Sequence, residues 1–317
     1  MIPLAVCFSA GGGERLNLIR PAQYFGMSDA SGAVAITSNL FAVASDEDNI
    51  LRLYRSDKPG QPVKQFELNE FLKVRGKSLE ADLEAGARIG QRAYWIGSHG
   101  RNRIGKERAN RCRFFAMDIQ EIGQEASLVV VGKPYQRLLE DLIAATQFQS
   151  FDFADAARRA PKEEGALNIE GLSATPDGKL LLGFRNPIPR GNALLIPMLN
   201  PEEVIEGQHV RFGSAIQLDL GGLGIRDIEF CSDAYLIIAG SYHGGGRFQL
   251  FRWVGPGSIP EALRVDHLND YNPEAIIFYP HLGWSEIQIL SDDGSRKDKS
   301  GHSKGTFRSF WLRSVKE

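Results

Sequence analysis

Apolar and polar residues alternate over four to eight positions in most of the chain, and glycine, proline, asparagine or aspartate bounds each run. This period of two is typical of β-strands whose two faces meet different surroundings. Continuous apolar runs, such as residues 180–182 and 235–239, indicate strands that are buried on both faces. The clearest alternating runs are residues 50–54, 113–117, 215–220 and 248–253.

A short acidic motif recurs and divides the chain into similar units. It consists of aspartate or asparagine, any residue, and glutamate, and a small or apolar residue follows. The copies are Asp82-Leu83-Glu84, Asn168-Ile169-Glu170, Asp227-Ile228-Glu229 and Asn272-Pro273-Glu274, with a weaker first copy at Met27-Ser28-Asp29. After each acid an apolar strand ends in a polar turn. Except between Glu84 and Glu170, the spacing is close to the roughly 40–50 residues of a four-stranded propeller blade.

These units predict an all-β fold, a β-propeller that forms a single domain over residues 1–317, with five blades as the preferred number. The long interval indicates a helical insertion at residues 134–160, where apolar residues follow helical spacing. A sixth, degenerate blade within residues 118–166 is the alternative. We expect residues 3–9 to form a strand that completes the last blade beside residues 307–312.

Composition agrees with a turn-rich globular chain. Glycine contributes 34 of 317 residues, above the usual share of about 7%. Lys+Arg total 37 and Asp+Glu 39, and this formal net charge of -2 argues against a general nucleic-acid binder. The three cysteines, Cys7, Cys112 and Cys231, lack metal-binding or disulfide spacing. The apolar start has no Lys or Arg before it and the chain offers no membrane span, so we expect a cytoplasmic protein.

The acidic motifs predict a ring of carboxyl groups. Residues two apart in a strand point to the same face, and the first strand of each propeller blade lines the central channel. Carboxylates gathered there need either raised pKa values or a bound cation. A set of oxygen ligands without Cys or His favours Ca²⁺ or Mg²⁺. The alternative is that these acids only accept hydrogen bonds from neighbouring backbone amides and have a structural role. The predicted metal ligands are Asp29, Glu84, Glu170, Glu229 and Glu274.

The polar turns after the second strands are expected to meet at one rim of the channel. His99 and His243 are candidates for proton transfer, and Arg185 is a candidate clamp for an oxyanion. Each side chain could instead be solvated or bridge two blades. The predicted catalytic group is His99, Arg185, Tyr242 and His243, and the predicted substrate contacts are Asp46, Arg101, Asn102, Asn186 and Asp292.

Residues 101–113 form a basic loop with six positive charges and one negative charge. Such a loop can attract an anionic substrate or an acidic partner, although a solvated loop explains it as well. No aromatic residues are interleaved to favour single-stranded nucleic acid.

The chain resembles a bacterial domain-of-unknown-function family, which in turn looks related to the phytase-like esterase propellers. A looser similarity is to the calcium-activated nucleotidases, and it implies that the acid of each first strand faces the axis. The motifs that carry the resemblance are residues 27–35, 44–49, 82–85, 94–102, 168–172 and 183–187.

These observations favour a metal-assisted hydrolase of an anionic small molecule, with a phosphoester as the expected substrate. A non-catalytic propeller that binds a ligand or protein on its rim is the first alternative, and a lactonase-like metal-dependent enzyme is the second. Fold alone does not separate them.

Overall fold

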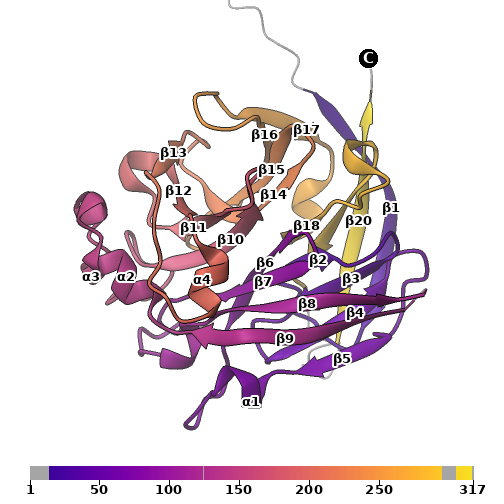
Figure 1. Ribbon diagram of the computed structural model, residues 1–317. Helices are drawn as coiled ribbons and strands as arrows, with labels where there is room; N and C mark the ends of the chain where they lie inside the picture. Colours follow the sequence, from indigo (N-terminus) through magenta and orange to yellow (C-terminus); the bar gives the residue numbers. More distant parts are fainter. Residues whose placement is uncertain (1–13, 124, 295–304, 316–317) are drawn as a thin grey trace, which may run out of the picture.

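The computed structural model describes residues 14–123, 125–294 and 305–315, and antiparallel β-sheet dominates them (Figure 1). Strands adjacent in sequence pair with each other and form four-stranded meanders. The first contains β2 (Gly32–Ala35), β3 (Leu40–Ala44), β4 (Ile50–Arg55) and β5 (Lys64–Glu67). The second contains β6 (Leu83–Ile89), β7 (Arg92–Gly97), β8 (Phe114–Ile122) and β9 (Glu125–Tyr135).

The later meanders repeat this order. The third contains β10 (Asn168–Ala174), β11 (Leu180–Asn186), β12 (Ala193–Met198) and β13 (Ile216–Leu218). The fourth contains β14 (Gly224–Cys231), β15 (Ala234–Gly240), β16 (Gln249–Trp253) and β17 (Glu261–Val265). The fifth contains β18 (Pro273–Ile277), β19 (Ile287–Ser291), β20 (Thr306–Val315) and β1 (Arg15–Phe25).

The fifth meander joins the two ends of the described chain. Strand β1 pairs antiparallel with β20 along its length, and both lie together in Figure 1. A short parallel pairing of β1 with β17 links the fourth and fifth meanders into one eight-stranded sheet. Residues 3–9, which we expected to form this closing strand, lie outside the described residues, and β1 holds the position beside β20.

The first strands of the meanders contact one another in a closed cycle. Strand β2 contacts β6, β6 contacts β10, β10 contacts β14, β14 contacts β18, and β18 contacts β2. Apolar clusters fill the space between successive meanders in the same order around the cycle. Large side chains such as Trp95, Trp253 and Tyr54 are fully buried there. Since burying one large apolar side chain stabilises a fold by about 1.5–3 kcal/mol, these clusters hold the ring together.

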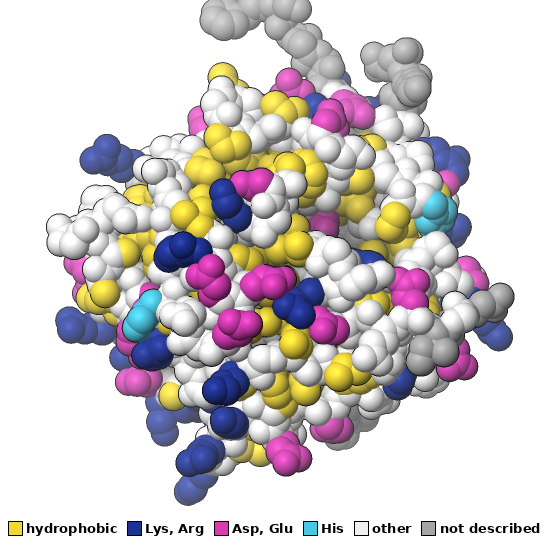
Figure 2. Space-filling view, in the orientation of Figure 1, with side chains coloured by type: hydrophobic (Ala, Val, Ile, Leu, Met, Phe, Trp, Pro, Cys, Tyr) yellow, Lys and Arg dark blue, Asp and Glu magenta, His cyan; other side chains and the backbone are white. Residues whose placement is uncertain are grey.

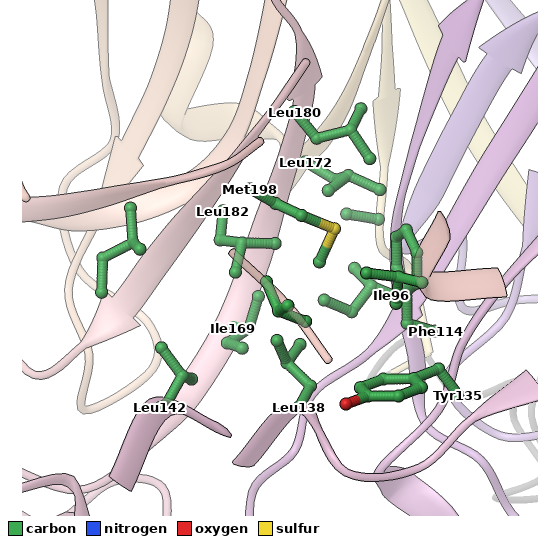
Figure 3. Close-up of a cluster of buried hydrophobic side chains, with 14 of the residues drawn as sticks. Ile96, Phe114, Tyr135, Leu138, Leu142, Ile169, Leu172, Leu180, Leu182 and Met198 are labelled. Carbon is green, nitrogen blue, oxygen red and sulfur yellow. The ribbon is translucent and has the colours of Figure 1, made fainter. Parts of the chain in front are cut away.

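Helical turns occupy the segment assigned to an insertion. They are α2 (Leu138–Ala144), a 3₁₀ turn at Thr146–Phe151 and α3 (Phe153–Ala156). Leu138, Leu142 and Phe148 are buried in the cluster between the second and third meanders, beside Ile169 and Leu182 (Figure 3). Within the described part of residues 118–166 there is no further meander, only the end of β8, β9 and these turns.

Two other short helices lie on connections between strands. Helix α1 (Asn69–Leu72) leads from the first meander to the second, and α4 (Pro201–Ile205) joins β12 to β13.

Candidate functional site

A polar cavity of about 460 Å³ lies where the first strands of the meanders begin and the second strands end. We call it the axial cavity. Acidic and basic side chains mix around the middle of the face shown in Figure 2. The cavity is lined by Ser31, Asp46, Asp82, Glu84, Arg103, Arg111, Pro161, Lys162, Asn168, Glu170, Arg185, Arg226, Ser241, Gly244, Gly245, Phe248, Asn272, Glu274 and Asp292.

A register shift at the start of four first strands directs one charged side chain each into this cavity. In β6, β10 and β18 the residue at the shift is Glu84, Glu170 and Glu274. In β14 the corresponding residue is Arg226. A bulge residue leaves the ladder and re-aims its side chain, so the four occupy equivalent places.

Glu229 is therefore not in the position that we expected from its motif. It lies three residues beyond the shift in β14, pairs in register with Leu236, and does not line the cavity. Burial raises its pKa well above the usual range, and the charge of Asp227 adds to the effect. Asp29 precedes β2 and also stands outside the lining residues.

Arginines neutralise part of the acidic ring. Arg226 forms an ion pair with Glu170 at 3.0 Å and a two-pronged pair with Glu274. Arg185 donates from Nη1 to Oε1 of Glu170 at 2.7 Å. All four side chains are largely buried, since at most 11% of each is exposed. These contacts offset the charge of Glu170 and Glu274, for which the sequence pattern had left raised pKa values or a bound cation as the two possibilities.

Arg111 also forms ion pairs with carboxyl groups, in the segment that precedes the second meander. Its Nη1 lies 2.8 Å from Oδ2 of Asp82, and its Nη2 contacts Glu80. Burial raises the pKa of Asp82 to about 7, although Arg111 acts in the opposite direction.

Other carboxyl groups at the cavity have no ion pair within the described residues. Burial raises the pKa of Glu84 and of Asp46 well above the usual range, and the charge of Asp82 raises both further. Burial also raises the pKa of Asp292. The pKa of nearby Asp29 rises to about 7 because of burial and of repulsion by Asp292.

Among the described residues, no group of three or more His, Cys, Asp or Glu side chains could hold a metal ion. Glu170 and Glu274, two of the predicted metal ligands, form ion pairs with arginine. Binding of Ca²⁺ or Mg²⁺ stays a prediction from the sequence.

His99 and Arg101 belong to a separate cavity of about 460 Å³, beside Cys112, Arg137 and Arg158. The His99 ring is buried, its Nδ1 lies 2.8 Å from the Gly97 carbonyl oxygen, and its buried Nε2 has no hydrogen-bond partner within the described residues. Burial lowers the pKa of His99 to about 4. Neighbouring Asn102 accepts hydrogen bonds from two backbone N–H groups of its own loop.

Asn186, Tyr242 and His243 surround the segment that carries Lys162 rather than line the axial cavity. Asn186 Nδ2 donates to the backbone oxygens of Pro161 and Glu163, at 3.2 and 2.7 Å. His243 Nδ1 lies 3.2 Å from the Lys162 carbonyl oxygen, and its ring centroid lies 3.9 Å from that of Tyr242 with the two rings tilted by 37°. Asn186 and His243 therefore help to fix where Lys162 enters the cavity.

Six of the residues predicted from the sequence line the axial cavity. They are Asp46, Glu84, Glu170, Arg185, Glu274 and Asp292. The sequence prediction missed Arg226 and Lys162 as lining residues. Arg103 and Arg111 lie in the basic loop that the sequence did mark. Lys162 carried no motif that could have revealed it, because it follows the helical insertion.

The strand arrangement resembles that of known β-propeller-like enzymes. Glutaminyl cyclase from Myxococcus xanthus matches with a TM-score of 0.51 at 14% identity, over 96% of this chain and 100% of its own. A GH43 β-1,3-galactosidase matches with a TM-score of 0.52 at 11% identity, over 93% of this chain and 59% of its own. At such low identity the likeness shows a β-propeller-like fold alone.

The chain belongs to the family described as "Protein of unknown function (DUF3616)", which matches residues 29–135 and 118–274. No curated protein matches it. Within the described ranges, no helix is both long and apolar enough to cross a membrane.

Proposed function

We propose that this chain is a five-bladed β-propeller enzyme, that its axial cavity binds a small anionic substrate, and that it hydrolyses a phosphoester there. The closed cycle of first strands and the clusters between successive meanders support five blades. The eight-stranded sheet then represents two blades joined through the short β1–β17 pairing.

The observation that carries the proposal is the gathering of cationic side chains around one cavity. Arg103, Arg111, Lys162, Arg185 and Arg226 all line it. Six carboxyl groups line the same cavity, and burial raises the pKa of Glu84 and Asp46, which weakens their negative charge relative to that of an exposed carboxylate. A confined site of a few hundred Å³ that is rich in cationic groups suits a small anion.

Different residues would bind the phosphoryl group and transfer protons. Arg185 and Lys162 would hold the phosphoryl oxygens, because guanidinium and ammonium groups make strong charge-assisted hydrogen bonds to phosphate. When water attacks phosphorus and the ester P–O bond breaks, the leaving oxygen needs a proton. A carboxyl group whose pKa is raised by burial, such as Glu84, can supply it. An ionised carboxylate in the cavity can accept the proton of the water.

Turnover of p-nitrophenyl phosphate and bis(p-nitrophenyl) phosphate tests the proposal, with Ca²⁺, Mg²⁺ or chelator present. Lys162→Gln should raise KM about tenfold, equivalent to ~1.4 kcal/mol. Glu84→Gln should lower kcat by a factor of about 10²–10⁴, the usual range for a general acid. Arg159→Gln is the control, because Arg159 forms an exposed ion pair with Asp155 away from the cavity. Binding without turnover would favour a non-catalytic propeller.

A further inference from the structure

The carboxyl groups of the axial cavity that have no ion pair lie on different parts of the ring. Asp46 follows β3 in the first meander, Glu84 lies in β6 of the second, and Asp292 follows β19 in the fifth. These meanders are consecutive in the cycle of first strands. None of the three carboxyl groups has an ion pair within the described residues, yet Asp46 is close enough to Asp292, and Glu84 to Asp46, for mutual repulsion. We call these three residues the acid side.

Three of the five cationic groups come from the third and fourth meanders and the segment before them, whereas Arg103 and Arg111 lie in the connection between β7 and β8, where Arg111 is paired with Asp82. Lys162 precedes β10, Arg185 lies in β11 and Arg226 in β14. The ammonium group of Lys162 has no hydrogen bond or ion pair to any described residue. A Cβ atom on Gly244 would lie 2.8 Å from Lys162 Nζ and 3.4 Å from Arg185 Nη2, so both cationic heads meet above this glycine.

Arg185 provides a second, independent sign of a ligand. The residue is only 7% exposed, and its Nη1 is committed to Glu170. Its Nε is buried without a hydrogen-bond partner, and no described residue bonds its Nη2, which lies near the Lys162 ammonium group above Gly244. A guanidinium N–H group without a partner can bind an oxygen of a phosphate or carboxylate.

We infer that the axial cavity selects a molecule that carries both an anionic group and an ammonium group. The anionic group binds at Lys162 and Arg185, and the ammonium group binds at the acid side. An ammonium group offers three donors, which matches the three carboxyl groups without an ion pair, and Oδ1 of Asp46 is buried with no hydrogen-bond partner among the described residues. The inference rests on the proposed function and narrows its substrate class to phosphate esters of amino alcohols.

Calorimetric titration with three probes tests the inference in calcium-free buffer at neutral pH. The probes are 2-aminoethyl phosphate, 2-hydroxyethyl phosphate and ethyl phosphate. We expect 2-aminoethyl phosphate to bind the wild-type protein at least tenfold more tightly than the other two. Glu84→Gln should reduce this preference at least tenfold, measured as the ratio of the dissociation constants of 2-aminoethyl and ethyl phosphate, whereas Lys162→Gln should weaken all three by a similar factor.

Glu164→Gln serves as the matched control, since Glu164 lies in the same segment as Lys162 but does not line the axial cavity. Asp46→Asn replaces Glu84→Gln if the latter does not fold, as judged by its melting curve. Equal dissociation constants for the three esters would overturn the inference and leave the proposed function standing. A preference that survives both Glu84→Gln and Asp46→Asn, or an absolute need for Ca²⁺, would overturn it too. Failure of every ester to bind would instead refute the proposed function.

Discussion

Replacing Arg226 tests whether arginine, not a bound cation, compensates the acidic ring. Arg226 pairs with both Glu170 and Glu274, and only 11%, 4% and 10% of these side chains is exposed. The change Arg226→Met keeps most of the apolar stem but removes the charge. Removing one partner of a buried pair costs about 3–5 kcal/mol, because the other charge stays buried and unpaired. Arg185 still faces Glu170, so most of the loss arises at Glu274.

Urea unfolding followed by circular dichroism at pH 7.5 measures the loss. Arg252→Met is the matched control, because Arg252 pairs with Asp233 at the surface, where the side chains are 25% and 69% exposed. Such a surface pair contributes about 0–1 kcal/mol. If the free energy of unfolding of both variants falls by the same small amount, Arg226 does not compensate the buried charges of Glu170 and Glu274.

Three further measurements address other parts of the molecule. Burial lowers the pKa of His99 to about 4, so the unfolded chain binds the proton first as the pH falls below its ordinary value of about 6.5. Between pH 7 and 4.5, the free energy of unfolding of the wild type should therefore fall by about 2 kcal/mol more than that of His99→Asn. An equal fall for the two proteins in urea unfolding would contradict this. Gly244 has φ +82, so Gly244→Ala should destabilise the fold by about 1–2 kcal/mol through backbone strain. The added methyl group should also displace Lys162 and weaken phosphate binding. Unchanged stability and binding would contradict the close approach of Lys162 to Gly244. The metal prediction requires Ca²⁺ to raise the melting temperature of wild type more than that of Glu170→Gln, and equal shifts would speak against it.

Strand periodicity and the repeated acidic motif located the strands of the ring and several cavity residues. Glu84, Glu170 and Glu274 sit at equivalent register shifts because each motif meets its strand in the same way. The fourth motif misled the prediction, since Arg226 occupies the shift in β14 and Glu229 lies beyond it. A register shift depends on pairing with the neighbouring strand, which the local sequence does not encode.

The separation of His99 from the cavity has a similar cause. His99 lies two residues beyond the end of β7, as expected, but it has a left-handed backbone (φ +56), its ring bonds to Gly97, and it lines a separate cavity beside the helical insertion. Asn186 and His243 bind the backbone of the segment that carries Lys162 into the axial cavity. Contacts between segments so distant in sequence produce no periodic pattern in the sequence, so the sequence does not predict them.

The most direct test of the central claim is to locate an oxyanion in crystals of the wild-type protein. Tungstate is tetrahedral like phosphate, and its metal scatters anomalously, so its position can be assigned without ambiguity. The account predicts one peak in the axial cavity, in contact with Arg185 and Lys162, that is displaced by excess phosphate. A peak only in the cavity of His99, Arg101 and Arg137, or none in the axial cavity, would contradict it.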